Sequence, residues 1–151
     1  MPSGPVLVLY ATVSGNSEQL AHAAAGTLRA DGFAPAVRNV ADFPAAALAD
    51  WDVLLLVAST WGDGEPPPDA ADFAAALAAA PAGSLAAVRH AVLALGSSMY
   101  PGFCAFGRRL DADLARRGAR PLAPRVECDT RFKAGYERWL GEVRAALRAP
   151  A

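Results

Sequence analysis

The chain has 151 residues, a formal net charge of −1 and 54% hydrophobic residues. This length fits one domain, and the apolar content excludes a disordered chain. No apolar run approaches the roughly 18 residues of a membrane-spanning helix, and the first residues lack a secretory signal pattern.

Strand and helix patterns alternate along the sequence. The apolar run at 6–10 predicts a strand buried on both faces, and 18–30 predicts a helix that ends near a glycine. Two more strands are expected at 34–40 and 52–58. The remaining predicted elements, in chain order, are a helix at 68–80, a strand at 89–95, a helix at 103–117, a strand at 121–126 and a helix at 132–147.

This alternation argues for a parallel sheet with helices on both faces, because parallel strands need crossover connections. We therefore expect an α/β fold and a single domain over 1–151. Ligands of such sheets bind beyond the carboxyl ends of the strands, where the strand order reverses. The loops after the first, third and fourth strands are the candidate site.

The first loop has hydroxyl groups and a glycine between a strand and a helix start. Backbone N–H groups at a helix N-terminus bind phosphate without a basic side chain. The absence of a GxxxxGK[ST] pattern excludes an NTP-cleaving P-loop. A simple helix cap by Asn16 or Ser17 is the alternative. The loop consists of Thr12, Val13, Ser14, Gly15, Asn16 and Ser17.

The second and third loops each carry an aromatic residue among glycines. Trp61 lies in Ser59–Pro68, and Tyr100 lies in Gly96–Cys104. Two aromatic side chains on neighbouring loops can hold a flat ring between them, and glycines let backbone groups reach the edge of that ring. The two loops therefore favour a planar ligand with a phosphate at one end.

Three motifs in this order resemble the flavodoxin family: TVSGNS, STWGDGE and LGSSMYPGFC. The length is similar to that of short-chain flavodoxins. The segment LAAVRHAVLALGS resembles MioC-type flavodoxins, and GEPPPDAADF is similar to the FMN domains of diflavin reductases. The resemblance implies a flavodoxin-like three-layer sandwich with a five-stranded parallel sheet of order 2-1-3-4-5, and FMN as the cofactor.

The resemblance also implies roles for single residues. The first loop holds the FMN phosphate and Ser59 adds a contact, while Trp61 covers the inner face of the ring and Tyr100 the outer face. The Gly62 carbonyl turns toward flavin N5, and backbone groups of the third loop bond the pyrimidine edge. In the reductase-like members, the position of Asp129 is near the flavin. The remaining cofactor-binding residues of these loops are Thr60, Asp63, Gly96, Ser97, Gly102, Phe103 and Cys104.

By this resemblance the protein shuttles single electrons between a flavodoxin reductase, or a similar donor, and an acceptor enzyme. The alternative is a flavodoxin-fold reductase that reacts with NAD(P)H or a quinone. Charge is uneven: 39–88 has no Lys or Arg. This asymmetry predicts an acidic docking face for a basic partner. The acidic face consists of Asp63, Glu65, Asp69 and Asp72.

The remaining expectations concern cysteines, basic residues and location. Cys104 and Cys128 form no metal-binding pattern with His22 or His90, so we expect no metal and a reduced thiol pair in the cytoplasm. Basic residues in the last two helices alternate with acids, which argues against nucleic-acid binding. We expect a monomer that does not bind membranes.

Overall fold

The central sheet is built from the strands with the longest apolar runs. In the computed structural model, which describes residues 5–61 and 64–149, these are β1 (Pro5–Ala11), β3 (Val53–Ser59) and β4 (Arg89–Leu95). They are buried on both faces, as such runs predict for a parallel sheet. All strand pairs are parallel and follow the order β2-β1-β3-β4-β5, which confirms the expected fold class.

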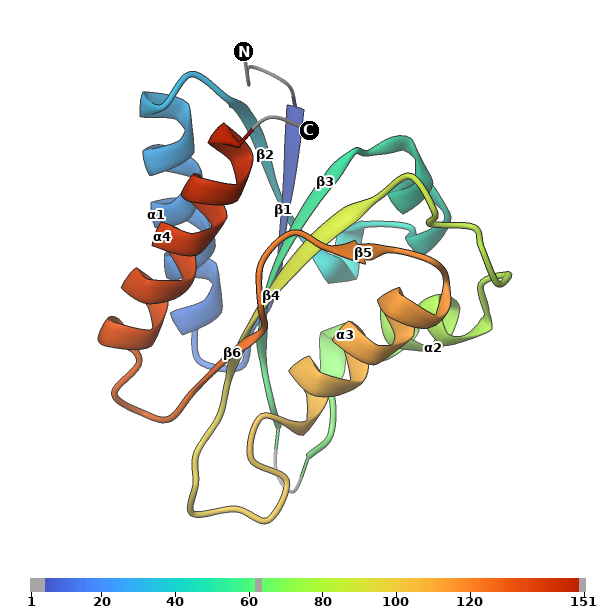
Figure 1. Ribbon diagram of the computed structural model, residues 1–151. Coiled ribbons are helices and arrows are strands. Elements are labelled where there is room, and N and C mark those ends of the chain that lie inside the picture. Colours follow the sequence, from blue (N-terminus) through green and yellow to red (C-terminus); the bar gives the residue numbers. More distant parts are fainter. Residues whose placement is uncertain (1–4, 62–63, 150–151) are drawn as a thin grey trace.

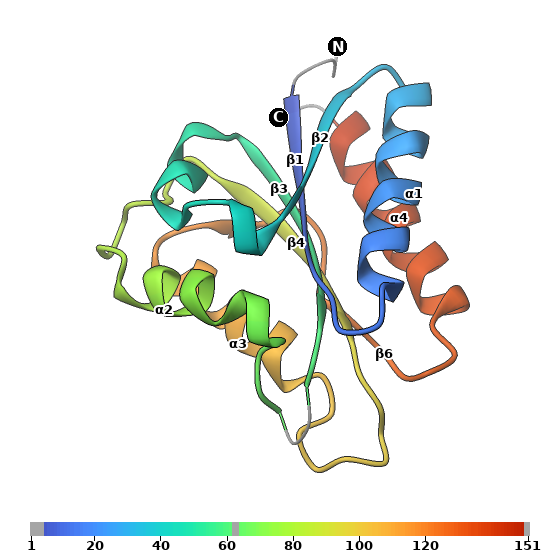
Figure 2. The ribbon, with the colours of Figure 1, turned by 180° about the vertical axis from the view of Figure 1, so that it is seen from behind.

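Helices cover both faces of the sheet (Figures 1 and 2). One face packs against α1 (Asn16–Ala30) and α4 (Lys133–Arg148), with the fully buried Trp139 at its centre. The other face packs against α2 (Ala71–Ala79) and α3 (Ala105–Arg116). Strand residues alternate between these two cores, so Leu7 and Leu9 pack in one and Val6 and Val8 in the other.

The segment between β2 (Ala34–Asn39) and β3 forms two short 3-10 helices. These are η1 (Val40–Asp42) and η2 (Ala45–Asp50). A third, η3 (Pro68–Ala70), directly precedes α2, so the helix expected at 68–80 starts as a 3-10 turn.

The expectation of one strand over 121–126 is wrong. The outer edge of β4 is paired instead with two short strands, β5 (Arg120–Pro121) at its start and β6 (Val126–Cys128) at its end. Pro124 lies between them and has no N–H to donate to the ladder. The edge strand is therefore interrupted, and its second half extends two residues beyond the predicted end.

The loops after β1, β3, β4 and β6 gather at the carboxyl edge of the sheet, the lower end in Figure 1. No helix within the described residues is long and apolar enough to cross a membrane. The fold therefore brings the loops singled out from the sequence to one edge.

Candidate cofactor-binding site

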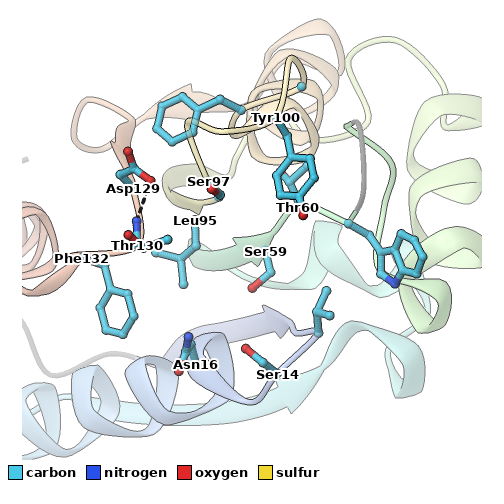
Figure 3. Close-up of a pocket in the computed structure, with 15 residues that line it drawn as sticks. Ser14, Asn16, Ser59, Thr60, Leu95, Ser97, Tyr100, Asp129, Thr130 and Phe132 are labelled. Carbon is cyan, nitrogen blue, oxygen red and sulfur yellow. Dashed lines mark hydrogen bonds between the residues drawn. The ribbon is translucent and has the colours of Figure 1, made fainter.

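A cavity of about 450 Å³ opens at this carboxyl edge (Figure 3). Its volume falls within the range of roughly 300–1,000 Å³ that is typical of small-molecule and cofactor sites. The described lining residues come from four segments: the first loop (12–17), the start of the second loop (59–61), the end of β4 with the third loop (95–104), and a fourth loop (129–132) after β6. Of the described lining residues, Asp129 is the only charged one at neutral pH.

The first loop forms the end of the cavity at the N-terminus of α1. The Gly15 N–H donates to Thr12 Oγ1 at 2.8 Å, and Gly15 has a φ of 92°, a conformation that favours glycine. The first helical bond runs from the Gln19 N–H to the Gly15 carbonyl. The N–H groups of 16–18 therefore have no partner inside the helix, which makes this end suited to an anion.

A hydrogen bond between two serines, Ser17 and Ser59, joins the first loop to the second. The Ser17 hydroxyl is fully buried and lies 2.6 Å from the Ser59 hydroxyl. In Figure 3, Ser59 faces Ser14 and Asn16 across the cavity. This hydrogen bond fixes the start of α1 against the end of β3.

The second loop turns back on itself directly after Trp61. The Trp61 N–H donates to the Glu65 carbonyl and the Glu65 N–H donates to the Trp61 carbonyl, both at 2.8 Å. The Trp61 residue remains 43% exposed although its backbone is held. A Cβ on Gly64 would lie 3.4 Å from the Gly102 Cα, so this turn packs against the third loop.

The third loop closes at its ends and projects in the middle. A Cβ on Gly96 would lie 2.8 Å from the Cys104 nitrogen, so only glycine allows this close approach. Tyr100 is 53% exposed on the cavity side, and Met99 is 89% exposed beside it. The described large hydrophobic residues that are exposed all belong to this edge of the sheet: Val13, Trp61, Met99 and Tyr100.

The buried Cys104 side chain joins the end of this loop to β4 and β6. Its side chain is fully buried, and its thiol donates toward the Ala94 carbonyl at 3.4 Å and the Cys128 carbonyl at 3.5 Å. Burial raises the pKa of the Cys104 thiol to about 12. The group therefore stays a thiol at neutral pH and is a poor nucleophile.

The fourth loop adds Asp129, Thr130 and Phe132 to the cavity wall. Hydrogen bonds from the Ser98 hydroxyl, the Ser98 N–H and the Thr130 N–H lower the pKa of Asp129. The carboxylate is therefore ionised at neutral pH. Phe132 closes the side of the cavity away from Tyr100, as Figure 3 shows.

Comparison with known proteins identifies the family. The flavodoxin family model matches residues 8–139. The chain belongs to the flavodoxin family. It therefore has an FMN-binding, electron-transferring function, which implies redox partners.

Two curated relatives are flavoprotein alpha-components of sulfite reductase. The chain is 36% identical over 143 residues to the sulfite reductase [NADPH] flavoprotein alpha-component of Shewanella sp. (strain MR-7), covering 95% of this chain and 24% of the relative. The corresponding protein of Bacillus subtilis is 38% identical over 145 residues, covering 96% and 24%. The chain thus spans about a quarter of the length of these curated relatives.

A solved flavodoxin matches over nearly the full length of both chains. This is a cysteine-to-serine variant of flavodoxin from Pseudomonas aeruginosa, with a TM-score of 0.82, 27% identity, and coverage of 96% of this chain and 99% of that chain.

Most residues expected from the flavodoxin motifs meet at one cavity. Those that line it are Val13, Ser14, Asn16, Ser59, Thr60, Trp61, Gly96, Ser97, Tyr100, Gly102 and Phe103. Thr12, Gly15, Ser17 and Cys104 belong to the same loops but do not line the cavity, and Ser17 and Cys104 are fully buried. Gly62 and Asp63 lie outside the described residues.

The lining also contains residues outside the three motifs. These are Asp129, Thr130 and Phe132, while Leu95, the first residue of the third motif, also lines the cavity without having been expected to bind the cofactor. Of these, Asp129 alone had a sequence signal, through the resemblance to reductase-like members, whereas Phe132 was expected only as the start of a helix.

The residues present fit FMN. The first loop offers free N–H groups and hydroxyls, which can bind a phosphate monoester without a basic side chain. The exposed Trp61 and Tyr100 rings border the same cavity, so a flat ring bound there would cover aromatic surface that otherwise faces water. The donor set therefore suits a flavin mononucleotide.

Proposed function

We propose that FMN binds in this cavity with its phosphate at the first loop and its ring between Trp61 and Tyr100. The observation that carries the proposal is the pairing of two features in one cavity of about 450 Å³. One end has the free N–H groups of a helix start, and the other has two exposed aromatic rings.

At the phosphate end, backbone and hydroxyl groups provide the binding energy. The N–H groups of 16–18 point out of the α1 terminus, and the side chains of Ser14 and Asn16 line the space in front of them. Thr12 supports the loop from behind through its bond from the Gly15 N–H. Ser17 and Ser59 hold the two loops together at 2.6 Å.

At the ring end, the protein excludes water and orients a planar group. Trp61 provides one aromatic face and Tyr100 the other, while Ser97 and Gly102 provide backbone polar groups at the edge. Gly62, Asp63 and Cys104 belong to this end by their place in the motifs. FMN supplies the one-electron chemistry when bound, and the chain tunes it.

We propose that the whole chain acts as one binding domain and as a carrier of single electrons. Among the described lining residues, Tyr100 and Asp129 are the titratable groups, and Asp129 is held in its ionised form. A carrier needs no proton-donating side chain of its own, so this lining suits it. The alternative is a reductase that reacts with NAD(P)H or a quinone.

The test is a titration of the apoprotein with FMN, followed by steady-state NADPH oxidation. We expect one FMN per chain, with tryptophan fluorescence quenched as the ring covers Trp61. We expect NADPH oxidation only after a flavodoxin reductase is added. Rapid NADPH oxidation by the isolated holoprotein would favour the reductase alternative, and no FMN binding would contradict both.

Redox partners dock, we propose, on the acidic face. Glu65, Asp69 and Asp72 are exposed on the segment that leads from the second loop into α2, and Asp63 belongs to the same stretch of sequence. Glu65 is paired with Trp61 through two backbone hydrogen bonds, so a basic partner bound there would lie close to the ring end of the cavity. Opposite charges speed such encounters, and salt screens them within a Debye length of about 8 Å at physiological ionic strength.

The docking proposal predicts that salt slows electron transfer from a basic reductase. The double variant Glu65→Gln with Asp69→Asn should lower the transfer rate at low salt and weaken its salt dependence. The matched control is Glu137→Gln with Glu142→Gln, which removes the same charge from exposed positions on α4. Equal effects of both double variants would point to net charge alone.

We also propose a cytoplasmic monomer. Cys104 and Cys128 are buried free thiols, which suits a reducing compartment. Sedimentation equilibrium of the holoprotein near 15.6 kDa would support the monomer, and a dimer mass would contradict it.

A further inference from the structure

The middle of the third loop is fastened to the fourth loop through one carboxylate. The Ser98 N–H donates to Asp129 Oδ1 at 3.1 Å, and the Ser98 hydroxyl donates to Oδ2 of the same group. The Thr130 N–H donates to Asp129 Oδ1 at 2.8 Å, the bond drawn in Figure 3. Three donors from two loops therefore converge on Asp129.

The rest of the third loop is bonded locally. The Tyr100 N–H donates to the Ser97 carbonyl at 3.1 Å, and the Met99 N–H donates to the Ser97 hydroxyl at 3.3 Å. Among the hydrogen bonds between described residues, those of Ser98 with Asp129 are the only ones that join 97–101 to a distant part of the chain. Ser98, Met99 and Tyr100 are all exposed, so packing contributes little to holding them.

The bonds of Ser98 therefore help to hold Tyr100, two residues later, in position. The loop ends are fixed by the Gly96 N–H, which donates to the Cys128 carbonyl at 3.0 Å, and by the buried Cys104. Between these ends, Ser98 is bonded to a segment that is itself anchored, since the fourth loop directly follows β6. A loop that is already ordered when a ligand arrives loses less entropy on binding.

We propose that Asp129 is a positioning residue of the FMN site, which holds the third loop so that Tyr100 is in place before the cofactor enters. This rests on the proposed placement of FMN in the cavity. The charged form of Asp129 is the one that accepts all three hydrogen bonds. Thr130 and Phe132 then complete the wall that the fastened loop faces.

The first test uses the apoprotein and needs no cofactor. Amide hydrogen exchange at Ser98 and Tyr100, measured by NMR, should be about tenfold faster in Asp129→Ala than in the wild type, because a charge-assisted hydrogen bond is lost. The control Glu142→Ala, an exposed acid on α4, should leave both rates unchanged. Unchanged exchange in Asp129→Ala would overturn the proposal, whether or not FMN binds.

The second test compares FMN affinities by fluorescence titration. Asp129→Ala should raise the dissociation constant about tenfold, and Ser98→Ala about threefold, because the Ser98 N–H still bonds the carboxylate. Asp129→Asn keeps an acceptor for that N–H and should recover most of the affinity. Riboflavin should show the same fold changes, because the loop contacts the ring end.

A different outcome would assign another role to Asp129. If Asp129→Ala bound FMN more tightly while binding riboflavin as the wild type does, the carboxylate would act through repulsion of the phosphate, and the proposal would be wrong. If the wild type bound no FMN, the proposed function would fail while the exchange test still decided the loop contact.

Discussion

The first and third loops line the same cavity but are held in different ways. The first loop is fixed by short-range bonds, from the Gly15 N–H to Thr12 and from the Gln19 N–H to Gly15, and by the fully buried Ser17, which is bonded to Ser59. The middle of the third loop is exposed, and its long-range bonds go to Asp129, 31 residues away from Ser98.

This difference separates two tasks in one site. A preformed helix terminus can bind an anion without rearrangement, so the first loop supplies affinity. The third loop presents a ring that must lie against a planar ligand, so its order decides how well the ring is covered. Loss of the phosphate and loss of either aromatic ring measure the two ends of the cavity directly.

The largest expected effect is the loss of the phosphate. Riboflavin should bind at least about 100-fold more weakly than FMN, because each hydrogen bond to a charged group contributes roughly 1.5–3 kcal/mol. Titration of the apoprotein with each ligand measures the ratio. Equal affinities would show that the first loop is only a helix cap.

Removal of either aromatic ring should weaken FMN binding at the ring end of the cavity. Tyr100→Ala and Trp61→Ala should each raise the FMN dissociation constant about 30-fold, since stacking adds about 0.5–1.5 kcal/mol beyond the area buried. Met99→Ala is the matched control, because Met99 is more exposed than Tyr100 and does not line the cavity. A similar loss in Met99→Ala would mean that loop order, not stacking, is measured.

Asp111 on α3 is a control away from the cavity, because its partners are His90 near the start of β4 and Arg125 before β6. Its carboxylate accepts hydrogen bonds from the buried His90 at 2.8 Å and from Arg125 at 2.7 Å. Burial alone would raise the pKa of Asp111, but these two bonds lower it overall. At pH 7, Asp111→Ala should lower the free energy of unfolding by about 1.5 kcal/mol, with FMN affinity unchanged.

The sign of the pH dependence follows from the lowered pKa. A carboxylate whose pKa is lower in the folded protein stabilises it fully above the unfolded pKa of about 3.9, and that contribution is lost as pH falls through the folded value. Urea unfolding of both proteins should give a constant difference from pH 7 to about pH 5 and a shrinking one below pH 4. A difference that persists at pH 2 would contradict the ion-pair account.

The smallest expected effect concerns the bond between Ser17 and Ser59. Ser17→Ala and Ser59→Ala should each lower the free energy of unfolding by about 1 kcal/mol, the usual contribution of a neutral hydrogen bond. Because the two hydroxyls bond each other, the double variant should cost less than the sum of the two. Additive losses would show that each hydroxyl acts alone.

The same contrast explains what could be predicted from the sequence. The buried strands at 6–10, 52–58 and 89–95 were confirmed because continuous apolar runs are a local signal. Of the residues expected from the motifs, 11 line one cavity, because a parallel sheet places the loops after its strands at one edge.

The features that the sequence did not predict depend on the direction in which side chains point and on partners far away in the chain. Residue types alone do not show that the Thr12 hydroxyl turns to Gly15 or that Ser17 turns to Ser59. The interrupted edge strand around Pro124 and the fourth loop depend on how β6 pairs with β4. The contact between Ser98 and Asp129 joins two loops, so no local pattern indicates it.

The most direct test of the account is to map FMN binding by amide chemical shifts of the apoprotein. We predict saturable shifts at one FMN per chain, concentrated in 13–18, 59–61 and 96–103 and extending to Asp129. Residues at the opposite edge of the sheet, around Phe33 and Arg89, should not shift. Shifts centred on that opposite edge, or none at all, would contradict the placement of the cofactor in this cavity.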